Sequence, residues 1–203
     1  MDYWNDIITE KSWGILQEIR KLPINFILIG GWANYLWTKT HKSKDIDIVI
    51  VNFEDLNFLK KNYDLKKNNN LKKYEIKIES IDIDIYVPYY SKLSIPVEDL
   101  AKYSTKVQNF NVVSPEALLI LKQGAEIDRG DSIKGKKDRI DIMSLLLSLE
   151  INFEKYNEMI NKYNLDDFRQ RLKKIIMTFN DVEYLDLNIR ELKIKKRGIL
   201  NRL

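Results

Sequence analysis

The 203-residue sequence contains no cysteine and a single histidine, His41. The missing cysteines exclude disulfides, thiolate-bound zinc, iron–sulfur clusters and cysteine nucleophiles. One histidine, in what reads as an ordinary loop, leaves almost no material for a histidine-rich metal site or a Ser-His-Asp triad. Any catalysis by this chain must therefore depend on carboxylates, lysines and backbone amides.

Long apolar runs are also missing. No stretch approaches the roughly 18 apolar residues of a membrane-spanning helix, and no basic-then-apolar segment opens the chain as a signal peptide would. With 44% hydrophobic and 32% charged residues, the composition is typical of a globular protein and not of a disordered one. We therefore expect a cytoplasmic protein with no membrane partner.

The positive charge is unevenly distributed along the chain. The formal net charge is +4, yet residues 190–203 alone carry six basic side chains and one acidic one. A second basic stretch, residues 60–77, has seven lysines against Asp64 and Glu75. Such stretches suit a polyanion such as RNA or a nucleotide, and they equally suit a solubilising surface. Charge alone does not decide between the two.

The first part of the chain alternates between helical and strand patterns. Apolar spacing predicts helices at 2–22 and 54–61, a short helix at 97–103 and a helix start after residue 31. It predicts strands at 26–29, 45–51 and 74–87 (one strand or two), and an edge strand near 110–113. The turn residues at 68–70 predict a loop. Because helical and strand patterns alternate along this part of the chain, we expect a mixed α/β (α+β) core over residues 1–113.

The second part is mainly helical. Ser114 followed by Pro115 is a helix start, with serine as the N-cap and proline at the first helical position. Helical spacing then predicts helices at 117–123, 139–149, 153–163 and 166–179. We find neither an internal repeat nor a long linker, and we expect residues 114–203 to form a helical bundle after the mixed-sheet core.

A glycine pair follows the first predicted strand. Gly30 and Gly31 lie between the apolar run 26–29 and the next helix start. A strand–Gly-Gly–helix turn lets the backbone approach a phosphate closely, and the free amides of the helix start favour an anion.

Two strands carry paired aspartates. Asp45 and Asp47 lie two residues apart, as do Asp82 and Asp84, so each pair projects from one face of its strand. Carboxylates that converge repel each other unless a cation lies between them, and Mg²⁺ prefers hard oxygen ligands together with substrate phosphates. Two such ions, bridged by Asp45 and Asp47, would hold a triphosphate and activate a hydroxyl for in-line attack. The third carboxylate, from the second pair, would ligate the ion nearest that hydroxyl and help to deprotonate it.

These motifs resemble the DNA polymerase beta-like nucleotidyltransferase superfamily. The likeness rests on GGWA at residues 30–33, DIDI at 45–48 and the later Asp-x-Asp strand, and it covers roughly residues 25–145. Smaller members with a helical second half, including antibiotic nucleotidyltransferases and abortive-infection nucleotidyltransferase toxins, are the most similar. The resemblance implies a mixed sheet flanked by helices, then a helical bundle, with the NTP bound in the cleft between.

The resemblance also assigns roles to residues. It implies that Gly30 and Gly31 bind the triphosphate and that Asp45 and Asp47 bind metal. For the third carboxylate it favours Asp84, which begins the DIYVP stretch, with Asp82 as the alternative. One position departs from the pattern, because many members have serine where this chain has Trp32. We still include Trp32 among the predicted nucleotide-binding residues.

Further nucleotide contacts are expected from the second half of the chain. Lys122 and Arg129, seven residues apart, share a helix face if the helix continues, and they would reach the phosphates as fixed positive charge. Lys137 and Asp138 would contact the nucleotide or brace the site. The alternative for these residues is that Asp138 caps the following helix while Asp141 and the basic side chains form surface pairs.

Three functional hypotheses follow from the sequence. The first is a Mg²⁺-dependent enzyme, of a toxin type regulated by an antitoxin partner, that transfers NMP from an NTP such as ATP to a hydroxyl of tRNA, of a protein or of a small molecule. The basic stretches favour a nucleic-acid acceptor. The second is a catalytically degenerate nucleotide- or RNA-binding protein of the same fold, which Trp32 favours. The third is a structural partner protein whose aspartates lie on a solvated surface.

Overall fold

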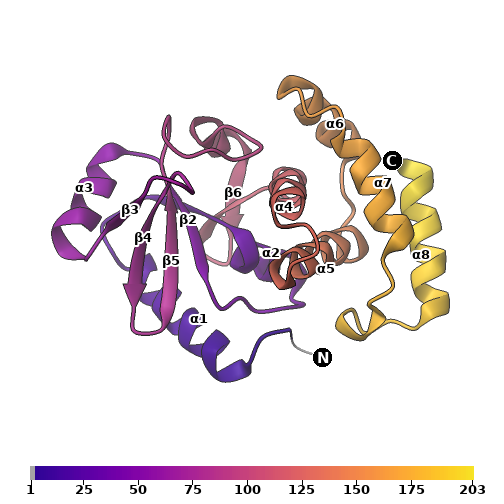
Figure 1. Cartoon of the computed structure of the whole chain (residues 1–203), viewed down its shortest axis with the longest axis horizontal. Coiled ribbons are helices and arrows are strands. Elements are labelled where there is room, and N and C mark those ends of the chain that lie inside the picture. Colours follow the sequence, from indigo (N-terminus) through magenta and orange to yellow (C-terminus); the bar gives the residue numbers. More distant parts are fainter. Residues whose placement is uncertain (1–2) are drawn as a thin grey trace.

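A computed structural model of the chain describes residues 3–203. Its centre is one seven-stranded sheet in the order β3-β4-β5-β2-β1-β7-β6, which mixes parallel and antiparallel pairs (Figure 1). The strands are β1 (Phe26–Ile29), β2 (Ile46–Ile50), β3 (Lys66–Asn68), β4 (Lys73–Ile78), β5 (Ile81–Tyr86), β6 (Ser104–Val107) and β7 (Phe110–Val113). The predicted mixed-sheet α+β fold is thereby confirmed.

The sequence of each central strand explains its position in the sheet. All four residues of β1 are buried, as expected of an apolar strand with neighbours on both sides. In β5 the isoleucines are buried on one face while Asp82, Asp84 and Tyr86 occupy the other. Strand β2 begins with the same alternation and ends wholly buried. The aspartates of β2 and β5 therefore lie on one face of the sheet and the isoleucine core lies on the other.

In the first half of the chain, helical segments lie before and between the strands of the sheet. They are α1 (Asp6–Arg20), α2 (Gly30–Thr38), α3 (Phe53–Asn62) and a 3₁₀ helix at Val97–Tyr103. After β7 the described elements are all helical: α4 (Pro115–Arg129), α5 (Ile133–Ser148), α6 (Phe153–Lys162), α7 (Phe168–Thr178), a 3₁₀ turn at Val182–Tyr184 and α8 (Ile189–Arg202). The division into two domains at residue 113 stays a prediction.

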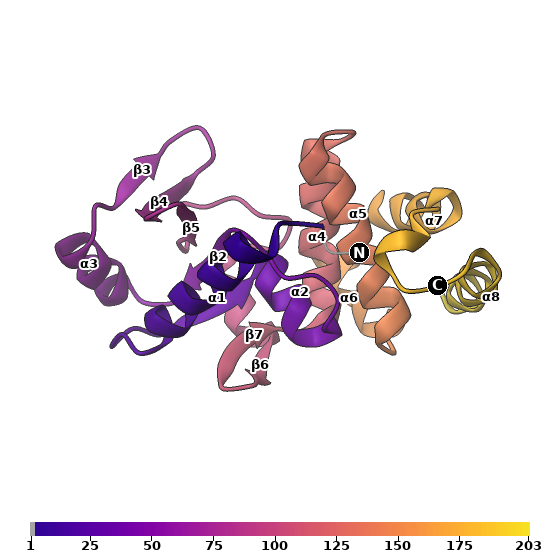
Figure 2. The ribbon, with the colours of Figure 1, turned by 90° about the horizontal axis from the view of Figure 1, so that it is seen from below.

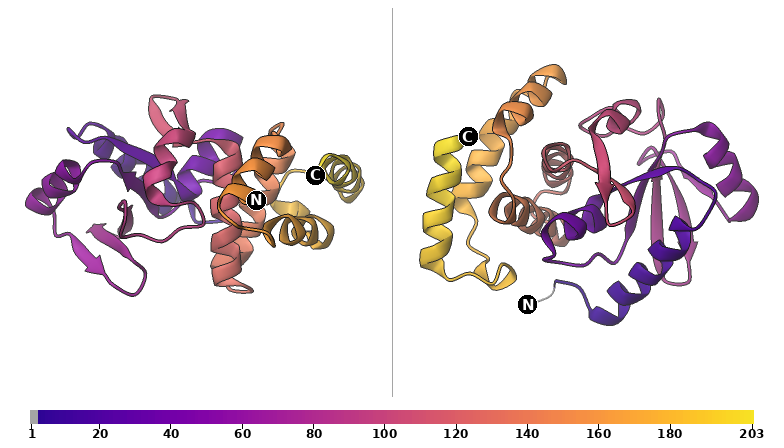
Figure 3. Two further views of the ribbon diagram at one scale, coloured as in Figure 1. Left: turned by 90° about the horizontal axis from the view of Figure 1, so that it is seen from above. Right: turned by 180° about the vertical axis from the view of Figure 1, so that it is seen from behind.

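The helical part is layered against the sheet part. Helices α4 and α5 form the inner layer, and α6, α7 and α8 lie beyond them, farthest from β3–β5 (Figures 1 and 2). The views from above and behind show the same order (Figure 3). The basic helix α8 is thus separated from the aspartate-bearing strands by the layer of α4 and α5. No helix within residues 3–203 combines the length and apolarity needed to span a membrane.

Several boundaries differ from those that the sequence predicts. The first helix begins at Asp6, with Asn5 as its N-cap, and residue 2 lies outside the described residues. Strand β7, expected at an edge, is internal because it pairs with β1 on one side and β6 on the other. Strands β3 and β6 were not predicted, and Asn68, expected in a loop, ends β3. The stretch 74–87 forms two strands, β4 and β5, joined antiparallel.

Candidate active site

Three adjacent strands bring the glycine turn and two of the predicted carboxylates into a row. In the antiparallel β1–β2 pair Ile29 lies opposite Asp47, so Gly30 follows directly beside that aspartate. In the parallel β2–β5 pair Asp47 lies opposite Asp84. Across the sheet the order is therefore Gly30, Asp47, Asp84, although the three residues are far apart in the sequence.

Both glycines are required by close contacts. Gly30 has a φ of +66°, and a Cβ built there would lie 2.1 Å from Oδ2 of Asp47. A Cβ on Gly31 would lie 2.4 Å from Oγ of Ser43. Any larger residue would displace the carboxylate or the hydroxyl, so the pair gives the backbone its close approach to both groups.

We expect Gly30→Ala to destabilise the protein by about 2–3 kcal/mol, because alanine is strained at positive φ and its methyl group meets Asp47. Gly14→Ala is the matched control. Gly14 is an exposed residue within α1, and a Cβ there meets nothing within 4 Å, so this variant should gain about 0.5–1 kcal/mol from helix propensity. Urea denaturation measures both, and equal effects of the two substitutions would contradict the assigned strain.

The two neighbouring carboxylates perturb each other. Burial raises the pKa of Asp47, and this outweighs the attraction of Lys122 and Arg129. Burial and then the neighbouring Asp47 raise the pKa of Asp84 to about 6, against the opposing contact with Lys73. Two partly desolvated carboxylates side by side are an unfavourable arrangement for stability alone. They are the kind of donor pair that a hard divalent cation binds.

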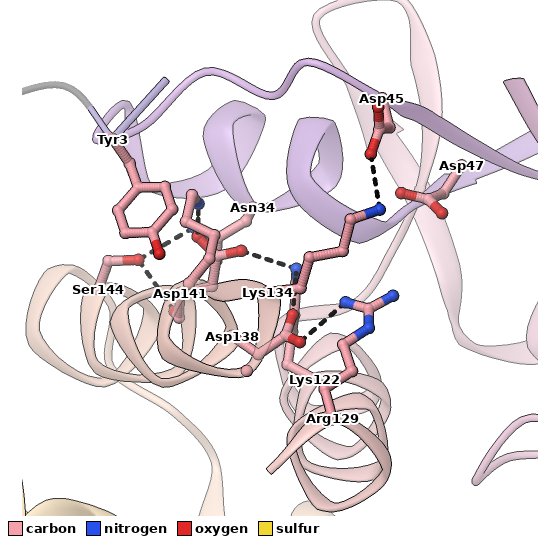
Figure 4. Close-up of polar contacts among 12 residues, drawn as sticks. Tyr3, Asn34, Asp45, Asp47, Lys122, Arg129, Lys134, Asp138, Asp141 and Ser144 are labelled. Atoms are coloured by element: carbon pink, nitrogen blue, oxygen red, sulfur yellow. Dashed lines mark hydrogen bonds and ion pairs between the residues drawn. The ribbon is translucent and has the colours of Figure 1, made fainter. Parts of the chain in front are cut away.

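Lysines provide the counter-charges at the outer two carboxylates. Lys134 Nζ lies 3.1 Å from Oδ2 of Asp45, and Lys73 Nζ lies 2.6 Å from Oδ2 of Asp84. Figure 4 shows the carboxylates of Asp45 and Asp47 directed toward the Lys134 amine. Within the described residues, no three Asp, Glu, His or Cys side chains converge in the arrangement of a metal site. The oxygen donor set of Asp45, Asp47 and Asp84 fits Mg²⁺ in its chemistry, and Mg²⁺ would take the place of the two ammonium groups.

An ionic network on α4 and α5, buried except for Arg129, borders the carboxylates. Lys122 Nζ lies 3.1 Å from Oδ1 of Asp138 and 2.7 Å from Oδ2 of Asp141, and Arg129 donates to Oδ2 of Asp138 at 2.8 Å (Figure 4). Lys137 also pairs with Asp141. Because α4 continues to Arg129, Lys122 and Arg129 share a face as predicted.

The pKa values of this network follow from its pairing. Burial by itself lowers the pKa of Lys122, but the carboxylates of Asp141 and Asp138 outweigh it and raise that pKa. Burial lowers the pKa of Lys137 despite Asp141. Asp138 lies inside α5 with 1% of its side chain exposed, so it does not cap that helix and its pairs are not surface pairs.

A small cavity of about 50 Å³ joins these groups. Asp45, Asp47 and Asp84 line it together with Gly31, Ser43, Lys44, Lys122, Arg129, Lys134, Lys137, Asp138, Asp141 and Trp4. Besides Asp45, Asp47 and Asp84, the predicted site residues are Gly30, Gly31, Trp32, Lys122, Arg129, Lys137 and Asp138. All of these except Gly30 and Trp32 line this cavity, and Gly30 adjoins Asp47. The structure thus gathers residues from both halves of the chain around the carboxylates.

Trp32 and Asp82 lie elsewhere. The Trp32 side chain is 1% exposed in the core, where Nε1 donates to Oγ of Ser12 at 2.9 Å, so it does not reach the nucleotide side of the turn. The expected nucleotide contact by this side chain is therefore corrected to a packing role. Asp82 is exposed, lies near Lys77 and is absent from the small cavity, whereas Asp84 lines it. Of the two, Asp84 is the one that lies opposite Asp47, and its role as the third carboxylate stays a prediction.

Sequence reasoning missed several side chains at the candidate site, among them Trp4 and Asp141. Ser43 and Lys44 come from the loop before β2, and Lys73 and Lys134 approach from β4 and the start of α5. The position of Ser43 and Lys44 directly before Asp45 was an available signal. No local pattern marks Lys134, which is 89 residues from its partner Asp45.

Comparison with known proteins identifies the fold. No protein-family model and no curated protein matches the sequence. A Helicobacter pylori protein described as a candidate nucleotidyltransferase is similar in structure, with a TM-score of 0.53 and 14% identity over 98% of this chain and 95% of its own. The chain has a nucleotidyltransferase fold.

Two further structures complete the comparison. JHP933 from Helicobacter pylori has a TM-score of 0.52 at 12% identity, over 97% of this chain and 91% of its own. The lincosamide adenylyltransferase LnuA, with lincomycin bound, has a TM-score of 0.45 at 17% identity, over 70% of this chain and 96% of its own. The two Helicobacter proteins match this chain over nearly its whole length, helical half included.

Proposed function

We propose that this protein is a Mg²⁺-dependent nucleotidyltransferase that moves NMP from an NTP to a hydroxyl acceptor. The observation that carries the proposal is the row formed by Gly30, Asp47 and Asp84 on three adjacent strands. Cationic side chains of α4 and α5 face the same small cavity, which suits a polyphosphate.

The cofactor and the residues have separate tasks. Magnesium, when held by Asp45, Asp47 and Asp84, supplies charge stabilisation at the reacting phosphate and a lower pKa for the attacking hydroxyl. The Gly30–Gly31 turn, Ser43 and Lys44 bind phosphate oxygens on the β1 side of the carboxylates. Lys122 and Arg129, fixed by Asp138, place positive charge toward the same oxygens.

The reaction balances as a single displacement. The acceptor oxygen forms a bond to the α-phosphorus as the bond from that phosphorus to the bridging oxygen of the β-phosphate breaks. Pyrophosphate leaves with the electron pair, and the hydroxyl proton passes to the Asp84 carboxylate. Because attacking and leaving oxygens are in line, the acceptor enters from the side opposite the glycine turn.

The test is label transfer from each α-³²P NTP with Mg²⁺ and separate pools of tRNA, cell protein and small metabolites. We expect a labelled product in one pool with the wild type and none with Asp45→Asn/Asp47→Asn. A labelled tRNA or protein band would favour the toxin-type activity with its antitoxin partner. Mg²⁺-dependent NTP binding without any labelled product would instead support a degenerate nucleotide-binding protein.

Ser43 gives a smaller prediction for the phosphate side of the site. It is buried at 8% exposure with its hydroxyl beside Gly31. We expect Ser43→Ala to weaken NTP binding about 5- to 20-fold, since one hydrogen bond to a charged group is worth about 1–2 kcal/mol. Isothermal titration with Mg²⁺–NTP measures the change, and Ser91→Ala, buried but in the segment after β5, should leave NTP affinity unchanged.

A further inference from the structure

A second, larger cavity of about 710 Å³ opens on the far side of Asp84 from the glycine turn. Asp84, Arg129 and Lys134 line both this cavity and the small one, so the two meet at the third carboxylate. A volume of this size is in the range of sites that bind a small organic molecule.

One face of α4 forms an apolar wall of this cavity. Leu121, Gly124 and Ala125 form it, and their spacing of three and four residues places them on one helix face, with the charged Asp128 one turn further along the same face. Lys122 is directed instead to Asp138 and Asp141, whereas Arg129 both pairs with Asp138 and contributes charge to the cavity lining. Helix α4 thus separates a charged contact with α5 from a mainly apolar contact with the cavity.

Other elements complete the apolar lining. Leu165 and Phe168, from the turn before α7 and its start, line the cavity beside α4, with Phe168 next to Gly124, and Leu93 also lines it. At the rim, Leu71 and Ile127 are 61% and 45% exposed. The small cavity and a cavity of about 300 Å³ over β4 and β5 are lined chiefly by charged residues. Compared with those two cavities, this one has an extended apolar wall.

The position of the cavity matches the direction of attack. The order across the sheet is β1 with the glycine turn, then Asp47 on β2, then Asp84 on β5 and Lys73 on β4. Phosphates at the glycine turn leave toward β1, so an in-line acceptor oxygen approaches past Asp84. The basic helix α8 contributes no residue to the cavities that Asp84 borders.

We propose that this cavity binds the acceptor, and that the acceptor is a small hydroxyl-bearing molecule with an apolar body. This assignment rests on the proposed nucleotidyltransferase function. The apolar body packs on the α4 face and Phe168, and the hydroxyl lies at Asp84, which takes its proton as the oxygen–phosphorus bond forms and pyrophosphate leaves. The apolar lining by Leu93, Leu121, Leu165 and Phe168 suits an apolar body better than it suits a polyanionic acceptor.

The absence of cysteine allows a direct test, because a single introduced thiol can be labelled uniquely. Ala125 is half-buried on the cavity wall and suits the change, whereas a Cβ on Gly124 would meet Oγ of Ser94 at 1.8 Å. The Ala125→Cys and Gly14→Cys variants are each coupled to a bulky maleimide. Nile red, an uncharged apolar fluorophore, is the probe for the cavity, and Mg²⁺–NTP binding is measured in the same samples.

We expect labelling of the Ala125→Cys protein to weaken its affinity for Nile red at least 10-fold, and labelling of the Gly14→Cys protein to leave that affinity unchanged. The affinity for NTP should stay within about twofold of the wild type in both labelled proteins. Retained Nile red binding after labelling at position 125 would overturn the apolar site. Loss of NTP binding on that labelling would place the nucleoside in the cavity and overturn the acceptor assignment. Protection of the introduced thiol by tRNA would overturn the small-molecule class.

The two proposals fail in different ways. If the unlabelled wild type binds no Mg²⁺–NTP, the nucleotidyltransferase function fails, and the acceptor role fails with it even where Nile red binds. If the wild type binds Mg²⁺–NTP but Nile red binding does not respond to the label at position 125, only the acceptor cavity fails.

Discussion

Asp47→Asn is expected to reduce NMP transfer by about 10²–10³-fold while making the protein more stable by about 1 kcal/mol. The two effects have opposite signs because Asp47 is a charge that the fold alone does not favour: burial raises its pKa despite nearby cations, and it adds to the raised pKa of Asp84. Removing the charge relieves that repulsion. The same change removes a ligand for the cation on which the reaction depends.

The measurements are label transfer with saturating Mg²⁺–NTP and urea denaturation without Mg²⁺. Asp82→Asn is the matched control, because Asp82 is on the same strand face as Asp84 but is exposed and lies outside the small cavity. It should change transfer by less than about threefold and stability by less than 0.5 kcal/mol. Full activity in the Asp47→Asn protein would remove this carboxylate from the site, and a loss of stability would show that its charge is paired in solution.

Asp141→Ala is the second large prediction, with an expected loss of about 3–5 kcal/mol in the free energy of unfolding. Asp141 is fully buried and accepts a hydrogen bond from Nδ2 of Asn34 at 3.1 Å while pairing with Lys122 and Lys137. Without it Lys137, 6% exposed, loses its carboxylate partner inside the protein. An uncompensated buried ammonium is far more costly than the loss of a surface pair.

A double variant separates charge balance from packing. Lys137→Met/Asp141→Asn removes one buried charge of each sign and retains side chains of similar volume, so we expect it to recover at least half of the lost stability. Its urea midpoint is compared with those of Asp141→Ala and Lys137→Met alone. A double variant no more stable than Asp141→Ala would mean that the loss at position 141 does not come from an unpaired Lys137, because asparagine still offers an oxygen to Asn34.

Residue patterns predicted those parts of the site that local geometry determines. The alternation of isoleucine with aspartate allowed each carboxylate pair to be placed on one face of its own strand, and the glycine turn follows directly from β1. The choice between Asp82 and Asp84 needed the β2–β5 register, which places Asp84 opposite Asp47. A register between strands separated by a helix and a hairpin has no signature in either strand alone.

Other features depend on partners that the sequence does not bring near. Trp32 follows the glycine pair and was expected at the nucleotide, yet its indole is turned to Ser12 on α1. Lys134 and Lys73 reach the carboxylates from α5 and β4, and Asp138 pairs with two residues of α4. Strands β3 and β6 are short and polar, and they pair with neighbours in hairpins that residue composition does not mark.

Those same two strands have a consequence for the protein at high concentration. They are the edges of the sheet, where unpaired backbone groups offer a template for a strand from another copy. Strand β3 has only three residues, two of them lysines, and β6 has four, with Lys106 among its exposed side chains. Short edges that carry positive charge disfavour sheet growth between molecules, so the isoleucine-rich centre is kept from nucleating fibres at either end.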